Sequence, residues 1–175
     1  DTEKTYRNMM TRYKYGGLSR PGLYLDETVM RMCYTHRRLF GQLALQLIGE
    51  GKKDKALKVL QKANKEIPTY NVPMNYMSGG TDIAKAYALL GQKKEALKCL
   101  NAVWNDAAQY ERYYQSLTGI RFIQAQRDCM VQMSILDQVR TITSLVDRKL
   151  AARQKAQLDN FYRTYIGMGG RIEQP

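Results

Sequence analysis

The sequence predicts an all-α fold of antiparallel helical hairpins, with about six to seven helices in 175 residues. A stretch near 37–68 has the residue spacing of a helix-turn-helix unit, and a similar unit recurs 40 residues later, near 78–108. No segment shows the sustained two-residue alternation of a half-buried strand. Because one such unit cannot bury its apolar face alone, we expect the repeated units to stack on each other.

The two units share an order of small and large residues. Small residues recur where the helices of a hairpin must approach closely: Ala44, Ala56 and Ala63, then Ala84 and Ala96. Larger residues fill the gaps between hairpins: Phe40, Leu43, Leu47 and Leu60, then Ile83, Tyr87 and Leu100. Gly51 and Gly91 end the first helix of each pair, where a left-handed backbone is needed, and Pro68 ends the first unit.

The remaining elements follow from caps and breakers. Residues 1–25 form a lead-in segment, in which Thr2 is the predicted N-cap of a short helix through Tyr13. Asp26 is the predicted N-cap of the next helix, which is expected to run to about Gly49.

A polar connector over 69–80 separates the two units, and its two interpretations stay open: a functional loop, or a surface loop tucked under Tyr70, Met74 and Tyr76. Thr81 or Ser78 is the expected cap of the following helix. Residues 120–166 are predicted to form a degenerate third hairpin that caps the stack, so 26–175 is one helical-repeat domain.

The composition is that of a globular protein, with 44% hydrophobic and 25% charged residues. The formal charge of +12 invites a nucleic-acid interpretation, but the excess is spread along the chain with acidic residues mixed in. Anionic headgroups or an acidic protein partner fit such a field at least as well. No apolar stretch approaches a membrane span, and because the chain starts at Asp1 we expect it to be part of a longer protein.

No residues with the pattern of a catalytic or metal site emerge. His36 is the single histidine and lies beside two arginines, without a ligand at metal-binding spacing. Cys33, Cys99 and Cys129 are far apart and sit among apolar neighbours, which is typical of core cysteines. We therefore expect no catalytic residue, no metal and no cofactor, and interpret the chain as a binding module and not an enzyme.

The spacing of the first unit resembles the tetratricopeptide repeat, while the second departs from it at Gly80 and Ala108. The resemblance implies a short right-handed solenoid in which the first helix of each pair lines a concave groove. Matched to the motif, the groove positions are Arg38, Leu45, Ile48, Thr81, Lys85 and Leu89. Arg38 and Lys85 are expected to hold a partner's carboxylates while Leu45 accepts an apolar side chain.

A second resemblance covers most of the chain. The runs Tyr15-Gly16-Gly17-Leu18 and 24–33 (YLDETVMRMC) are similar to the C-terminal soluble region of Bacteroidetes multi-pass membrane proteins. Those proteins are related to protein O-mannosyltransferase-like, TMEM-type glycosyltransferases. The resemblance implies that the chemistry lies elsewhere in a membrane-embedded parent, and that this region lies at the periplasmic face of the inner membrane.

Two function hypotheses from different classes follow. In the first, the chain is a non-catalytic interaction domain of a glycosyltransferase-like membrane protein, and its groove binds acceptor polypeptide or another protein or peptide partner with acidic groups. In the second, it is a basic helical-repeat module that binds nucleic acid, which steep salt dependence would reveal. The diffuse charge favours the first.

Overall fold

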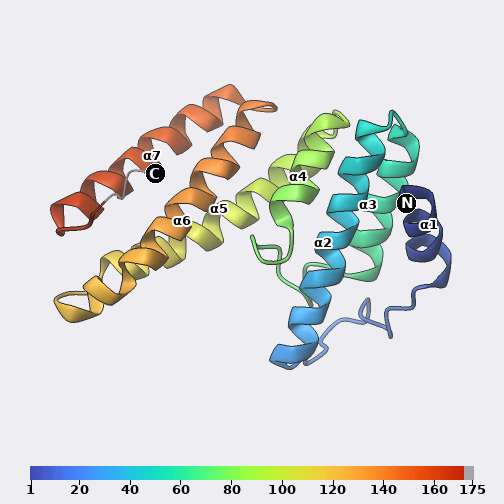
Figure 1. The fold of residues 1–175 in the computed structure, drawn as a ribbon, viewed down its shortest axis with the longest axis horizontal. Helices are drawn as coiled ribbons and strands as arrows, with labels where there is room; N and C mark the ends of the chain where they lie inside the picture. Colours follow the sequence, from blue (N-terminus) through green and yellow to red (C-terminus); the bar gives the residue numbers. More distant parts are fainter. Residues whose placement is uncertain (172–175) are drawn as a thin grey trace. The chain divides into compact units, whose positions relative to one another are not determined.

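The computed structural model describes residues 1–171. Over these residues the chain forms seven α-helices, one π-helical turn and no strand, which confirms the prediction of an all-α fold (Figure 1). The chain divides into two compact units, Asp1–Leu100 (unit 1) and Asn101–Pro175 (unit 2). Each unit has buried apolar residues of its own.

The lead-in segment begins with α1 (Thr2–Arg7), which continues directly into the π-helical turn η1 (Asn8–Arg12). The predicted cap was placed one residue too late, because Asp1 and not Thr2 is the N-cap. The Asp1 carboxylate accepts the backbone N–H of Lys4 at 3.0 Å. A negative group at this position also offsets the positive end of the helix dipole, which a threonine hydroxyl does not do.

The first hairpin consists of α2 (Glu27–Gly49) and α3 (Lys53–Glu66), which pack side by side (Figure 1). Asp26 caps α2 as predicted, since its carboxylate accepts the Val29 N–H at 2.9 Å. The alanines predicted to allow close approach are at most 1% exposed: Ala44, Ala56 and Ala63. Burying small residues between two helices lets their backbones come together without leaving a void.

The turn after the first helix has the same conformation in both hairpins. Gly51 and Gly91 have φ angles of 76° and 74°, a left-handed backbone that only glycine adopts without strain. In the first turn the Lys52 N–H donates to Leu47 at 2.8 Å; in the second, the N–H of Gln92 donates to Tyr87 at 2.9 Å. The repeat in the sequence is therefore also a repeat in backbone hydrogen bonding.

The second hairpin starts with α4 (Gly80–Leu89), which packs against α2, and continues into α5 (Lys93–Gln115). The prediction that Thr81 or Ser78 caps α4 is wrong. The N-cap is Gly79, and no side chain caps the helix.

Ser78 cannot serve as a cap because its hydroxyl is used inside the connector. It accepts the Asn75 N–H at 3.0 Å and donates to the Asn75 carbonyl at 3.0 Å, while the Asn75 side chain accepts the Ser78 N–H at 2.9 Å. Asn75 and Ser78 thus close a tight turn just before α4, and Ser78 is fully buried.

A buried arginine orders the rest of the connector. The Arg37 side chain is 1% exposed, and its guanidinium donates to the carbonyls of Ile67 at 2.8 Å, Val72 at 2.6 Å and Pro73 at 2.8 Å. Burial lowers the pKa of Arg37 to about 10, so the group stays charged at neutral pH. The carbonyl dipoles replace the water that a guanidinium would otherwise bind.

The connector packs against the helices of unit 1, but not through the residues predicted to hold it. Met74 is buried as expected, whereas Tyr70 and Tyr76 are 63% and 40% exposed. Val72 is fully buried in their place. The two tyrosines were predicted to pack inward because they are large and aromatic. The hydrogen bonds from Arg37 to the backbone instead determine which connector residues face inward.

Unit 2 contains the C-terminal part of α5 together with α6 (Ile120–Ser144) and α7 (Arg148–Gly167), which pack against each other (Figure 1). These two helices match the hairpin predicted over 120–166. Asp147 caps α7, since its carboxylate accepts the Leu150 N–H at 3.0 Å. The core of the unit includes residues from both helices: Phe122, Cys129, Met133, Leu136, Val139, Leu158, Phe161 and Tyr165.

Candidate functional site

The groove positions predicted from the sequence lie on α2 and α4, two helices of unit 1 that pack against each other. Five of them are exposed or half-buried: Arg38, Leu45, Ile48, Lys85 and Leu89. The sixth, Thr81, is only 5% exposed. Because it is buried, Thr81 does not present its hydroxyl to a partner.

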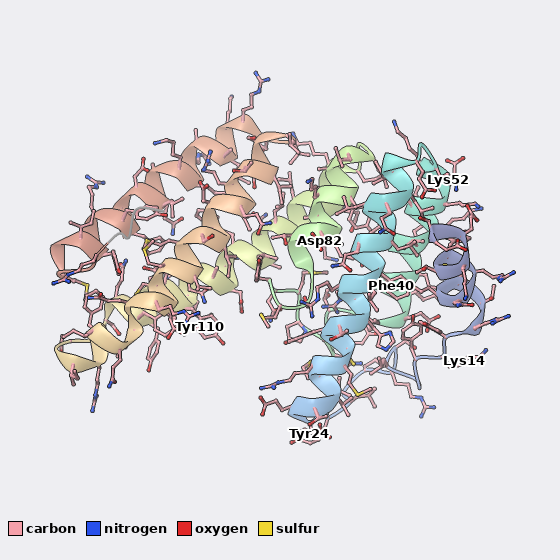
Figure 2. The ribbon with its side chains drawn as sticks, in the orientation of Figure 1. Lys14, Tyr24, Phe40, Lys52, Asp82 and Tyr110 are labelled. Atoms are coloured by element: carbon pink, nitrogen blue, oxygen red, sulfur yellow. The ribbon has the colours of Figure 1, made fainter. Side chains whose placement is uncertain are left out.

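Asp82 joins the two predicted cations, and sequence reasoning missed it. It lies on α4 (Figure 2), where its side chain is half-buried and both Lys85 and Arg38 act on it electrostatically. Burial raises the pKa of Asp82, while Lys85 and Arg38 oppose that rise. The spacing Asp82–Lys85, one helical turn apart, was the available signal. Arg38, Asp82 and Lys85 thus lie near one another, with two positive charges and one acidic group.

Two glycines allow α4 and the connector to lie directly on α2. A Cβ atom on Gly41 would come within 2.9 Å of the Asp82 Cβ. A Cβ atom on Gly79 would come within 2.6 Å of the Arg38 Cα. These close approaches fix the start of α4 beside Arg38, so the spatial relation of Arg38, Asp82 and Lys85 is set by backbone packing and not by flexible loops.

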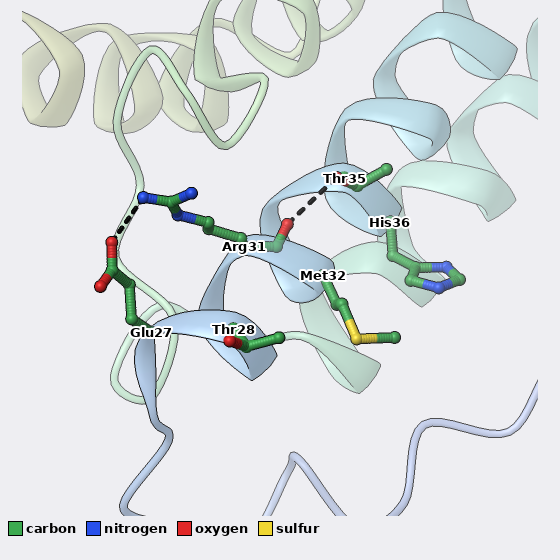
Figure 3. A pocket seen from close by; sticks show the side chains of 6 residues that line it. All are labelled: Glu27, Thr28, Arg31, Met32, Thr35 and His36. Carbon is green, nitrogen blue, oxygen red and sulfur yellow. Dashed lines mark hydrogen bonds and ion pairs between the residues drawn. The ribbon is translucent and has the colours of Figure 1, made fainter.

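A hollow of about 470 Å³ lies along the N-terminal half of α2 (Figure 3). It is lined by Glu27, Thr28, Arg31, Met32, Thr35 and His36. Glu27 and Arg31 form an ion pair at 2.5 Å along one edge, and Met32 is 58% exposed. An exposed thioether is polarizable and flexible, and such side chains adapt to varied apolar partners.

His36, which lines this hollow, packs against aromatic rings of the lead-in segment. The His36 ring meets the rings of Tyr13 and Tyr15 edge-on, with centroids 6.0 Å and 5.8 Å apart. Tyr15 also packs against Phe40, at 5.8 Å. His36 is therefore a packing residue between α2 and the lead-in.

The hollow and Arg38 of the predicted groove belong to one exposed stripe of α2, whereas the predicted positions Leu45 and Ile48 are half-buried, lie nearer the C-terminal end of the helix and are not part of this stripe. Side chains three, four or seven residues apart lie on the same face of a helix. We define the α2–α4 face as this stripe with its neighbours on α4: Thr28, Arg31, Met32, Thr35, Arg38, Leu39, Gln42, Lys85 and Leu89. Its apolar members Met32, Leu39 and Leu89 are 58%, 41% and 45% exposed. The sequence placed Leu89 on this face and missed the other two.

The connector does not cover this face. Arg38, Leu39 and Lys85 stay exposed although the connector ends at Gly79, next to Arg38. Apolar side chains in a row, flanked by cations, can bind an extended chain that carries apolar and acidic residues.

All three cysteines are free and buried, and burial raises the pKa of the Cys99 and Cys129 thiols to about 12. Between residues 1 and 171, no three His, Cys, Asp or Glu side chains gather in a way that could hold a metal ion. Within that range no helix is long and apolar enough to span a bilayer.

No protein-family model matches the chain, and no curated protein or solved structure is significantly similar to it. The two family resemblances drawn from the sequence therefore stay predictions.

Proposed function

We propose that the chain is a protein-interaction module, a short tetratricopeptide-like right-handed solenoid that binds an extended protein segment along the α2–α4 face. The observation that carries the proposal is the face itself. Met32, Leu39 and Leu89 are exposed beside Arg38 and Lys85, on two helices whose spacing is fixed by backbone contact.

The repeated hairpin turns support the solenoid part of the proposal. Gly51 and Gly91 have nearly equal φ angles and equivalent hydrogen bonds around them. Ala84 and Ala96 of the second hairpin are fully buried, as are Ala44 and Ala56 of the first. Units that repeat in both sequence and conformation are typical of stacked helical-repeat proteins.

The chemistry of the face suggests what the partner carries. Asp82 is the one carboxylate on which both Arg38 and Lys85 act electrostatically, and neither cation forms an ion pair among the described residues, so both are free to bind a partner carboxylate. The exposed side chain of Leu39 comes directly after Arg38, and that of Met32 lies less than two helical turns before it, so both suit apolar side chains of the same partner. We therefore propose a partner segment in which acidic and apolar residues alternate over a few positions.

The proposed parent follows from the family resemblance. In that proposal, the parent is a membrane glycosyltransferase-like protein, its active site lies outside this chain, and the module engages acceptor polypeptide or a partner at the periplasmic face of the inner membrane. The lack of a clustered catalytic or metal-binding set in residues 1–171 is compatible with a binding role.

Selection of a random peptide library on the immobilised protein tests the interaction proposal. We expect enriched peptides to contain acidic and apolar residues, and their affinity to fall about tenfold in an Arg38→Gln, Lys85→Gln double variant. Glutamine is preferred to glutamate here because an added carboxylate would repel Asp82.

A matched control removes two exposed cations from α7, Arg153→Gln and Arg163→Gln. This control has the same net charge as the test variant and is expected to bind the selected peptides like the unchanged protein. Failure to enrich any peptide, or equal loss of affinity in both variants, would refute binding at the α2–α4 face.

A further inference from the structure

The lead-in segment is fastened to α3, so both present their charges on a common side of unit 1. The Lys62 ammonium donates to the Met10 carbonyl at 2.8 Å, and the Lys55 ammonium lies over the Tyr6 ring, 5.1 Å from its centroid. Met9 is buried beneath them at 2% exposure. Figure 2 shows Lys52 and Lys14 on the same side of unit 1 as α1.

This side carries a group of exposed cations that form no ion pair among the described residues. We call it the basic face, and its members are Lys4, Arg7, Arg12, Lys14, Lys58 and Lys65. Residues 1–100 hold 18 of the 28 basic residues but only 9 of the 16 acidic ones. The net positive charge is therefore larger in unit 1 than in unit 2.

Some acidic groups near the basic face are already neutralised by lysines outside it. Glu3 lies between Lys52 and Lys55, at 2.6 Å and 2.8 Å, and Glu50 pairs with Lys52 at 2.7 Å. These hydrogen bonds lower the pKa of Glu3 to about 2, so the carboxylate stays ionised and paired. Asp1, Asp54 and Glu66 are the acids left to oppose the six free cations.

We propose that the basic face binds the anionic headgroups of a lipid bilayer. A bilayer surface needs only a set of uncompensated, mobile cations, and each lysine or arginine near it adds to the attraction. Six such cations on the lead-in segment and the neighbouring side of α3 meet that requirement. The proposal concerns a different surface from the α2–α4 face and does not depend on the peptide-binding proposal.

The rings on this side argue against a single-stranded nucleic acid as the occupant. Single-strand binders combine a basic track with free aromatic rings on which bases stack. Here Tyr6 lies under Lys55, while Tyr13 and Tyr15 are packed against His36. Tyr6 and Tyr15 are half-buried, and of these three rings only Tyr13 is exposed, at 43%, so this side lacks a row of free rings for stacking.

Vesicle co-sedimentation tests the proposal. The probe is a set of vesicles of zwitterionic phosphatidylcholine with about 30% anionic phosphatidylglycerol, at about 100 mM salt. We expect the protein to bind these vesicles and not pure phosphatidylcholine vesicles. The four substitutions Lys4→Glu, Lys14→Glu, Lys58→Glu and Lys65→Glu are expected to weaken binding at least about tenfold.

A matched control reverses four exposed cations on α7, namely Arg148, Lys149, Arg153 and Arg163, and so has the same net charge. It is expected to change vesicle binding less than about twofold. Far-UV circular dichroism checks that both variants stay helical, and the double variant Lys58→Glu, Lys65→Glu serves if the fourfold change disturbs the lead-in.

Four results would overturn the proposal. The first two are that the protein does not bind anionic vesicles, or that the two charge-matched variants lose vesicle binding equally. The third is that inorganic phosphate at about 10 mM displaces the protein from the vesicles. The fourth is that the protein binds an RNA oligonucleotide more tightly than vesicles and that the four basic-face substitutions abolish this RNA binding. The proposal is supported if the protein binds anionic vesicles and if the basic-face substitutions weaken this binding while the α7 substitutions do not.

Discussion

The amide of Gln115 donates a hydrogen bond to Oε1 of Glu111, one turn earlier on α5, at 2.7 Å. The same amide nitrogen donates to the Phe161 carbonyl on α7 at 2.9 Å. Glu111 is fully buried, and its Oε2 has no hydrogen-bond partner. The pKa of Glu111 is raised to about 7 by burial, and the Gln115 hydrogen bond opposes the rise only in part.

This carboxyl makes the stability of unit 2 depend on pH. The pKa of Glu111 is higher in the folded than in the unfolded state, where it is about 4.5. Its stabilising contribution to the free energy of unfolding is therefore fully present below pH 4.5 and is lost as the pH rises through about 7. At pH 8 we expect Glu111→Gln, which stays neutral, to have a free energy of unfolding about 1–3 kcal/mol higher than that of the unchanged protein.

The difference between the two proteins is expected to shrink toward pH 5, where the native carboxyl is protonated. Urea titrations followed by circular dichroism at pH 5, 6, 7 and 8 measure it. Comparing Glu111→Gln with the unchanged chain cancels the contributions of Asp82 and Asp106, whose pKa values burial also raises. A difference that stays constant with pH would show that Glu111 is not protonated in the folded state.

The Arg37 side chain should be one of the most sensitive positions in unit 1. Arg37→Met removes three hydrogen bonds and leaves the carbonyls of Ile67, Val72 and Pro73 without their donor. We expect the free energy of unfolding to fall by about 2–4 kcal/mol, measured by urea titration. The neighbouring Arg38→Met is the control, because Arg38 is exposed, and should change it by less than about 0.5 kcal/mol. Equal effects at the two positions would contradict the buried role.

The hairpins could be predicted from the sequence, whereas the difference in burial between Arg37 and Arg38 could not. Repeat spacing predicted the hairpins and their buried alanines, because small residues at fixed intervals have few other uses in helices. Arg37 follows Cys33 by four residues and precedes Phe40 by three, which places it on the buried stripe of α2. A charged residue on that stripe was overlooked, since burial of a guanidinium needs distant carbonyls that no local pattern reveals.

The candidate site was less predictable for a related reason. The motif located Arg38, Lys85 and Leu89, but it also included Thr81, which is buried. Met32 and Leu39 lie on the same helical stripe as Arg38, yet whether a stripe is exposed depends on which helices cover it. That is decided by the packing of α4 and the lead-in against α2, which sequence periodicity does not specify.

The approach of α4 to α2 can be tested with two glycines of the same helix. Gly41→Ala places a Cβ atom 2.9 Å from the Asp82 Cβ and 3.2 Å from the Ile83 nitrogen. Backbone cannot yield cheaply, so we expect a loss of about 1–3 kcal/mol in unfolding free energy. Gly49→Ala meets no atom within 4 Å and should stabilise α2 by about 0.5–1 kcal/mol. If the two alanines act alike in urea titrations, the helices are not in this contact.

The cysteines provide a test of burial in both units. Burial raises the pKa of Cys99, in unit 1, and of Cys129, in unit 2, to about 12, and it also raises that of Cys33. Because only the thiolate reacts, and because the thiols are covered, we expect a thiol reagent at pH 8 to label the folded protein at least about a hundredfold more slowly than a free thiol. In about 6 M urea all three should react at the rate of an ordinary thiol. Single-cysteine variants, with the other two changed to alanine, then assign each protected thiol to its unit. Fast labelling of Cys129 in the absence of denaturant would mean that the packing of α6 against α7 opens readily, and it would contradict the buried core described for that hairpin.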